Sequence, residues 1–228
     1  MTDDLFHRLA ASVGYDVPHG ANILDFGCGD GDLVERYVAA GYDAWGCDIL
    51  IVEDRGRLKA ILEPYALPFE DDSFDFIVSD QVFEHVQNPE AACAEIARVL
   101  RPGGLSIHVF PSKWRLIEPH VYVPLASSFR PRWWLAVWAK LGVRNEFQKD
   151  LSAAEVCEKN VAFLRDKTNY LSRSAIHAAF QTSFAETRFI EAGLMRSSRR
   201  IPSLAKPWIA SPLGLIYSET YQRIVMAR

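Results

Sequence analysis

The sequence lacks the features that would place it in several specialised classes of protein. Its longest notable apolar run, 133–139, is much shorter than the ~18 residues that a membrane-spanning helix needs. Its four cysteines include no C-x-x-C pair, which favours reduced packing thiols over a zinc site or a disulfide framework. The residues from Met1 to Asp4 are acidic where a secretory signal would be basic, so we expect a cytoplasmic protein. With 49% apolar and 24% charged residues among 228, the chain has the composition of one soluble domain.

A large excess of one charge is also missing overall, but the charges are unevenly divided along the chain. The formal net charge is −4, yet residues 1–100 hold 20 Asp/Glu against 6 Lys/Arg, and residues 101–228 hold 9 against 19. The first part is therefore acidic and the second basic, which argues against a globally basic nucleic-acid binder. Either the two parts meet different partners, or two solvated faces differ in sign.

Short β-branched and aromatic runs alternate with helical patterns from residue 22 to 110. This alternation is typical of a parallel sheet with crossover helices. Asn88 suits a helix N-cap and Pro89 the first helical position. The pattern predicts strands at 22–26, 42–47, 74–79 and 105–110, and helices at 32–40 and 89–100.

After Pro111 the alternation stops and an aromatic segment, 112–171, begins. Four of the six tryptophans fall between Trp114 and Trp138. One predicted helix follows Pro131 and buries a stripe of Trp134, Val137, Trp138 and Leu141, and a second starts at the capping box Ser152-x-x-Glu155. The return to the sheet is predicted as a helix at 174–180 and strands at 184–190 and 221–226. We expect one domain, 1–228, with a core at 1–111, an inserted helical lid at 112–171 and a return to the sheet at 172–228.

A strand, a glycine-rich turn and a helix follow one another from Ile23, where the sequence reads I-L-D-F-G-C-G-D-G. Glycine lets a backbone approach a ligand closely and tolerates positive φ. A dinucleotide fingerprint would need glycine where Asp32 stands, and the G-K-[ST] of a P-loop is absent. Asp25, Asp30 and Asp32 surround the turn and disfavour a pyrophosphate. They suit a ligand with positive charge and hydroxyl groups such as S-adenosylmethionine, whose ribose diol Asp48 is placed to bind.

At these residues the chain resembles the class I S-adenosylmethionine-dependent methyltransferases of the type 11 group. The resemblance covers about residues 20–111, and the matching segments are 23–31, Asp48, 67–75, 84–86 and 98–104. It implies a Rossmann-like α/β fold, with a seven-stranded, mostly parallel sheet flanked by helices and a helical lid inserted after the fifth strand. It also implies a cofactor-binding core that holds S-adenosylmethionine and releases S-adenosylhomocysteine. The residues implied for the cofactor are Asp25, Gly27, Cys28, Gly29 and Gly31 at the methionine end, Asp48 at the ribose, Ile49 against the adenine, and Gln81 lining the pocket.

One position departs from the pattern of the family. Members commonly place Asp, followed by a residue with a free amide, shortly before a Leu-Pro-Phe that begins here at Leu67. The corresponding residues are Glu63 and Pro64, and proline has no N–H to offer the adenine edge. The resemblance thus implies Glu63 at the cofactor with an altered adenine contact, or a register shifted by one or two residues.

Two histidines are candidates for the chemistry. Methyl transfer from a sulfonium is an in-line displacement, so alignment and the exclusion of water matter most. A hydroxyl acceptor would be helped by a general base with a pKa of about 6–7, which histidine supplies. His85, after the strand at 74–79, and His120, early in the lid, are the candidate catalytic residues, although Glu84-His85 could instead organise the turn before Asn88. His108, inside an apolar strand, is expected to be a core histidine.

Glu84-His85 also raises the question of a metal. Ubiquinone-pathway O-methyltransferases and small-RNA 2′-O-methyltransferases resemble this segment and bind a divalent cation through E-x-x-E-H. Here the first position is Gln81, and a neutral amide is a weaker ligand than a carboxylate for a hard cation. The sequence therefore favours no metal.

The second half of the chain bears on the methyl acceptor. Trp133 lies beside Arg130 and Arg132, an aromatic and basic edge that suits a membrane interface or a hydrophobic anionic acceptor, with core packing as the alternative. A second basic cluster, which indicates either an anionic acceptor or a solvated face, contains Arg188, Arg196, Arg199, Arg200 and Lys206. No RNA-binding module is recognisable, which disfavours nucleic acid.

Taken together, the sequence predicts a methyltransferase that acts on a small or lipid- or glycan-linked, amphiphilic or anionic acceptor, at oxygen. An RNA methyltransferase and a non-catalytic S-adenosylmethionine-binding regulatory protein are the alternatives. The acceptor itself and the oligomeric state stay open.

Overall fold

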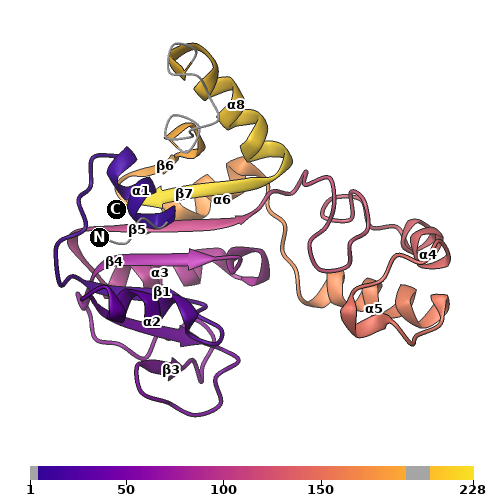
Figure 1. The fold of residues 1–228 in the computed structure, drawn as a ribbon, viewed down its shortest axis with the longest axis horizontal. Coiled ribbons are helices and arrows are strands. Elements are labelled where there is room, and N and C mark those ends of the chain that lie inside the picture. The colour runs from indigo at the N-terminus through magenta and orange to yellow at the C-terminus, as the bar shows by residue number, and fades with distance from the viewer. Residues whose placement is uncertain (1–4, 194–205) are drawn as a thin grey trace.

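A seven-stranded mixed sheet forms the centre of the protein (Figure 1). The structure, a computed structural model, describes residues 5–193 and 206–228. The strand order is β3-β2-β1-β4-β5-β7-β6, and only β7 runs antiparallel to its neighbours. This confirms the predicted sheet. The strands are β1 Asn22–Phe26, β2 Asp43–Asp48, β3 Leu58–Ala60, β4 Phe74–Asp80, β5 Leu100–Pro111, β6 Thr187–Phe189 and β7 Gln222–Ala227.

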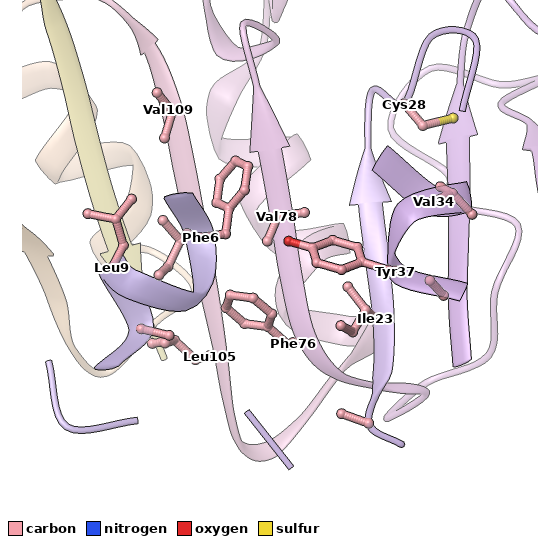
Figure 2. Packing of buried hydrophobic residues seen from close by; sticks show 14 of the residues in the cluster. Phe6, Leu9, Ile23, Cys28, Val34, Tyr37, Phe76, Val78, Leu105 and Val109 are labelled. Atoms are coloured by element: carbon pink, nitrogen blue, oxygen red, sulfur yellow. The ribbon is translucent and has the colours of Figure 1, made fainter. Parts of the chain in front are cut away.

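Helices cover both faces of the sheet because successive residues of each buried strand point to opposite sides. Ile23 and Phe76 pack with α1 (Leu5–Ser12) and α2 (Asp32–Ala39), and Figure 2 shows Phe6 and Leu9 of α1 turned toward the strands. Their neighbours in sequence, such as Leu24, belong to the opposite cluster with α3 (Pro89–Val99) and α6 (Arg173–Gln181). A further helix of the sheet region is α8 (Lys206–Thr220).

The segment after β5 forms a body with its own buried cluster, beyond the carboxyl ends of β4 and β5 (Figure 1). It contains α4 (Arg132–Lys140), the 3-10 helix η2 (Glu146–Gln148) and α5 (Ala153–Asp166). The predicted capping box is present, since Ser152 and Glu155 each accept a hydrogen bond from the other's backbone N–H. We call residues 112–171 the insertion.

The predicted buried stripe of α4 is wrong. Leu135 and Ala139 are the buried residues of this helix, whereas Val137 and Leu141 are exposed. Trp134 and Trp138 pack only partly against the cluster. The helix packs on the rest of the insertion through a face one residue away from the predicted one. Because this short helix has apolar residues on most of its sides, the elements packed against it determine which face is buried.

The structure also contains α1, β3 and α8, for which the sequence analysis gave no position. The crossover from β2 to β3 is also unusual, because residues 49–57 contain no helix, although parallel strands are usually joined through one. Strand β5 begins five residues earlier than predicted, at Leu100, and its register with β4 shifts between Phe74 and Phe76 to accommodate Pro102–Gly104.

No helix of 5–193 or 206–228 has the length and apolar character needed to cross a membrane.

Candidate functional site

The glycine turn between β1 and α2 has a shape that only glycine supports. Gly27 and Gly31 have φ values of 79° and 93°, and Gly31 forms the N-cap of α2. A Cβ on Gly27 would lie 2.3 Å from Cγ2 of Val82, and one on Gly31 would lie 2.7 Å from Cδ1 of Leu58. The turn is thus pressed between the end of β4 and the start of β3, with its backbone open to a ligand on its remaining side.

Two clefts flank this turn. The first, of about 440 Å³, lies between the turn and α1 and is lined by Asp25, Gly27, Cys28, Asp80 and others. The second, of about 410 Å³, lies between Gly29 and the loop that leads to β3. The helix α1, which the sequence did not predict, supplies Leu5 and Phe6 to the first cleft.

The carboxyl of Asp25, which lines the first cleft, has a raised pKa. Its side chain is buried, and burial raises its pKa to about 7, with further contributions from the charges of Asp80 and Asp48 against the opposing charge of Arg36. Such a carboxyl gains from a cationic partner, because a positive group at the cleft would favour the ionised form. A ligand ammonium fits this requirement.

Asp48 fastens the turn to the end of β2. One of its oxygens accepts a hydrogen bond from the Gly29 N–H at 2.9 Å, and the other accepts one from the Leu50 N–H at 2.8 Å. Each carboxylate oxygen has a second lone pair, so the residue keeps the capacity to accept from a diol. Asp48 itself lines neither cleft, but both of its backbone partners, Gly29 and Leu50, line the second one.

The other predicted cofactor residues lie less centrally. Ile49 is 71% exposed and Glu63 is exposed. Gln81 adopts a φ of 58° and donates a side-chain hydrogen bond to Asp80 at 3.0 Å. None of these three is among the described residues that line the two clefts. The thiol of Cys28 lines the first cleft, and burial followed by the charge of Asp25 raises its pKa to about 12, so it stays protonated.

The two candidate histidines meet. His85 belongs to the 3-10 helix η1 (Phe83–His85) after β4, and its Nδ1–H donates to the carbonyl oxygen of Lys167 at 2.6 Å. His120 belongs to the insertion, and its Nδ1–H donates to Glu118 at 2.7 Å. The ring centroids are 4.8 Å apart. In the neutral form of either ring, a proton on Nδ1 leaves the Nε2 atom with a lone pair.

Glu118 and Tyr170 were not singled out from the sequence. The buried carboxylate of Glu118 accepts hydrogen bonds from the backbone N–H groups of His120 and Val121, and from the hydroxyl of Tyr170 at 2.7 Å. Burial alone would raise the pKa of Glu118, but these bonds and the one from the His120 ring lower it. An ionised Glu118 therefore fixes the orientation of His120. In the sequence, the feature that could have indicated Glu118 is its position two residues before the candidate His120.

Glu84 completes the group. It is 1% exposed, and neither of its carboxylate oxygens has a hydrogen-bond partner among the described residues. Burial raises its pKa to about 7, while His120 opposes the rise and Asp80 adds to it. Asp80 thus lies close enough to influence both Glu84 and Asp25, so the cleft and the histidines are neighbours around the end of β4.

Two further expectations have outcomes. His108 is a core residue, as predicted: it is fully buried, its Nδ1 is 2.8 Å from Ser79 Oγ, and burial lowers its pKa to about 3. Of the basic cluster in the second half, Arg188 pairs with Glu186 at 2.8 Å. The other members, Arg196, Arg199, Arg200 and the side chain of Lys206, lie outside the described residues.

Comparisons with known proteins agree with this geometry. Residues 24–108 match the family model of a methyltransferase domain. An uncharacterized methyltransferase of Mycolicibacterium paratuberculosis is 38% identical over 121 residues, 47% of this chain and 44% of that protein. A probable tRNA methyltransferase 9B of Mus musculus is 36% identical over 104 residues, 42% of this chain and 23% of that protein. The chain thus spans less than half the length of these curated relatives.

The fold also has solved counterparts. An S-adenosylmethionine-dependent methyltransferase from Mesorhizobium loti has a TM-score of 0.53 at 13% identity, with 96% of this chain and 95% of that chain covered. At this level of identity the likeness concerns the fold alone.

Proposed function

We propose that this chain, whose residues 24–108 belong to the methyltransferase domain family, transfers a methyl group from S-adenosylmethionine to an acceptor oxygen. The observation that carries the proposal is the cleft of about 440 Å³ beside the glycine turn, with Asp25 and Asp80 in its lining. These carboxylates match the positive charge of the cofactor's ammonium and sulfonium groups.

In this proposal the cofactor spans the turn. The methionine end lies in the first cleft against Asp25, Gly27 and Cys28. The backbone of Gly29 and Gly31, farther along the same turn, is proposed to contact the cofactor as well. The ribose diol is bound by Asp48, and the adenine lies on the side of the second cleft, toward Ile49. Glu63 and Gln81 are proposed to act at the edges of this site, with the adenine contact altered because Pro64 has no N–H.

The acceptor meets the methyl group from the side of the histidines. The acceptor oxygen attacks the methyl carbon, the carbon–sulfur bond breaks, and S-adenosylhomocysteine leaves as a neutral thioether. The hydroxyl proton must be taken up, and we assign that role to Nε2 of His120 or His85, since the Nδ1 atoms contact Glu118 and the Lys167 carbonyl. Phe163 of the insertion packs against the His120 ring, with 5.2 Å between the ring centroids, and covers one side of it.

An amphiphilic acceptor is supported by the surface of the insertion. Trp133 is 60% exposed, and Arg132 beside it has a largely exposed side chain. Apolar residues exposed in this manner suit a small hydrophobic or lipid- or glycan-linked acceptor, including one reached at a membrane surface. The other exposed apolar residues of the insertion include Trp114, Leu116, Ile117, Tyr122 and Phe129.

The first test is binding of S-adenosylhomocysteine, measured by isothermal titration calorimetry on the full chain. We expect one site per chain with a dissociation constant in the micromolar range. Absence of a heat of binding at several temperatures and pH values would refute the proposal. If binding is found, transfer of labelled methyl from S-adenosylmethionine to a membrane lipid extract separates an enzyme from a protein that only binds the cofactor.

An RNA acceptor is the second candidate, favoured by the named activity of the Mus musculus relative. The acidic first half, with its 20 Asp/Glu against 6 Lys/Arg, argues against it because RNA binding depends on neutralising phosphates. Incubation of the chain and labelled cofactor with total tRNA at low salt decides the matter. Label in the RNA, and none in lipid or small molecules, would make this candidate the function.

A further inference from the structure

Two histidine nitrogens and a buried carboxylate converge at the end of β4. The ligand atoms of Glu84, His85 and His120 all lie within 4.8 Å of one another. The Nε2 of His85 is 4.0 Å from Oε1 of Glu84. Atoms bound at about 2.0–2.2 Å to one ion lie about 3–3.5 Å apart, so a closure of about an ångström would bring the three into ligating distance.

Glu84 gives an independent reason to look for a ligand here. Its side chain is fully shielded from solvent, and both of its oxygens lack a hydrogen-bond partner in the described part of the chain. A buried carboxylate without partners costs several kcal/mol unless it is protonated or neutralised. Among the described residues, the two histidines are the groups that come together with it within 4.8 Å.

The surroundings of the histidines match those of metal-bound imidazoles. Such a histidine usually donates its second ring N–H to a backbone carbonyl or a carboxylate, which fixes its tautomer and orientation. His85 donates to the Lys167 carbonyl, and His120 donates to Glu118. Glu118 is held in turn by the Tyr170 hydroxyl. In the described part of the chain, the Nε2 atom of each neutral ring is therefore available as a ligand.

We propose that Glu84, His85 and His120 form a binding site for one divalent transition-metal cation, such as Zn²⁺, Mn²⁺ or Co²⁺. Two imidazoles and one carboxylate suit these ions better than Mg²⁺ or Ca²⁺, which prefer oxygen ligands alone. Three protein ligands leave positions open for water or for an acceptor oxygen. The histidine side chains are 35% and 27% exposed, so solvent reaches the site.

The sequence favoured no metal, because Gln81 stands where related cation sites have a carboxylate. Gln81 instead bonds to Asp80, and His120 of the insertion fills out the site from a distant part of the chain. With a cation in place, the histidines act on the acceptor through the ion, which would polarise the acceptor oxygen and favour its deprotonation. The cation site itself does not depend on the proposed methyl transfer.

The test is a titration of the chelator-treated full chain with Co²⁺, followed by the visible absorption of the bound ion. We expect one ion per chain, with affinity lowered at least tenfold in Glu84→Gln and His120→Phe. His177→Phe is the matched control, because His177 also stacks on a phenylalanine, Phe189, but lies on α6 outside the site. The control should bind Co²⁺ within twofold of the wild type.

Calorimetry with S-adenosylhomocysteine on the same variants separates this proposal from the proposed function. Unchanged affinity for that ligand with loss of Co²⁺ supports the cation site. If a variant does not fold, nitrogen NMR of the wild-type protein replaces it, and Zn²⁺ should shift the signals of two of the six histidines. Absence of Co²⁺ uptake by the wild type, equal affinity in all folded variants, or no pair of shifted histidines would each overturn the proposal.

Discussion

The ring of His85 lies 4.8 Å from the ring of His120, measured between centroids, with their planes 71° apart. One residue follows a strand of the sheet and the other comes from the insertion. The root of the insertion is fastened to the same place, because the Asn169 N–H donates to the Glu84 carbonyl at 2.6 Å and its side chain donates to the Val86 carbonyl at 2.9 Å. Assembly of the site therefore depends on the insertion docking against the sheet.

Glu118 should act as a positioning residue for His120. Glu118→Gln places an N–H₂ group where the carboxylate accepts hydrogen bonds from His120, Val121 and Tyr170, so His120 loses its fixed orientation. We expect kcat for methyl transfer to fall about 10–100-fold while KM for S-adenosylmethionine stays within twofold. Steady-state kinetics with a saturating acceptor measure both.

Tyr170→Phe gives the graded comparison for Glu118→Gln, because it removes only one of the four donors to this carboxylate. Its effect on kcat should be smaller. A Glu118→Gln protein with full kcat, or one in which KM for the cofactor rises as much as kcat falls, would contradict the positioning role.

Local signals in the sequence were enough for the elements around the glycine turn. β1, α2, β2 and α3 all form close to their predicted bounds, and Asn88 caps α3 by accepting from the Ala91 N–H. Their determinants, a cap, a turn glycine or a buried apolar run, lie within the element itself. This is why the strands and helices on both sides of the glycine turn could be predicted.

The missed elements depend on partners far away in the chain. β3 has only three residues, Leu58–Ala60, and exists as a strand because β2 lies beside it. The sequence offers no cap for α1. Its buried residues Phe6 and Leu9 stabilise the helix only by packing on the sheet, which is formed by distant parts of the chain. α8 contains Pro212 within the helix, which a sequence pattern treats as a stop.

The residues of the candidate site were predicted one by one, and their grouping was not, because the grouping depends on contacts between distant parts of the chain. Asp25, Asp48, His85 and His120 were each chosen from their local motif. That His85 and His120 share one site, with Glu118 and Tyr170 behind them, follows from the path of the insertion. No spacing in the sequence encodes that path. The faces of α4 were misassigned for the same lack of information about neighbours.

Asp48→Ala should weaken binding of S-adenosylhomocysteine. The change removes the proposed acceptor for the ribose diol and also releases the Gly29 N–H, to which Asp48 is bonded at 2.9 Å. Loss of hydrogen bonds to a charged group corresponds to about 1.5–3 kcal/mol, or about 10–150-fold in affinity. Calorimetry provides the measurement. Asp54→Ala is the control, because Asp54 also accepts a hydrogen bond from a backbone N–H, that of Ala60. An Asp48→Ala protein with wild-type affinity would remove this residue from the cofactor site.

Gly27→Ala should lower cofactor affinity at least tenfold. A Cβ there would lie 2.3 Å from Cγ2 of Val82, so the turn or the end of β4 must move. Gly41→Ala is the matched control, since Gly41 also has a positive φ, 91°, but its Cβ would meet nothing within 4 Å. The control should lose about 1 kcal/mol of stability and keep its affinity.

A second substitution tests the cause of the Gly27→Ala effect. If the contact with Val82 is responsible, Val82→Ala in the Gly27→Ala background should restore part of the lost affinity. Equal affinity of Gly27→Ala and Gly41→Ala for S-adenosylhomocysteine would show that the turn does not contact the cofactor.

The affinity for S-adenosylhomocysteine should depend on pH through Asp25. Burial, Asp80 and Asp48 raise the pKa of this carboxyl to about 7 in the free protein, and the ligand ammonium favours its ionised form. Affinity should therefore fall as pH decreases below 7, approaching tenfold per pH unit, and level off at higher pH. Asp25→Asn should bind more weakly and without this dependence. Calorimetry between pH 5.5 and 8 gives both curves, and a flat curve for the wild type would refute the assignment.

His108 should make stability depend on pH in the opposite direction from Asp25 and Glu84. Burial lowers its pKa to about 3, so between about pH 3 and 6.5 the unfolded chain binds a proton that the folded chain excludes. Its contribution to stability is complete above about pH 6.5 and falls with pH by up to about 1.4 kcal/mol per unit. The two carboxyls have raised pKa values, so they contribute stability at low pH that is lost as pH rises toward 7.

Because these contributions overlap, the measurement must be a difference between variants. His108→Gln removes the titrating group, so its unfolding free energy relative to the wild type should improve by about 2–3 kcal/mol between pH 7 and pH 4.5 in urea denaturation. Ser79→Ala, which removes only the hydroxyl 2.8 Å from Nδ1, should cost about 1 kcal/mol and retain the wild-type slope with pH. A constant difference between His108→Gln and the wild type would mean that the imidazole takes up its proton inside the folded protein, with water or movement of Phe83 and Phe180 admitting the charge.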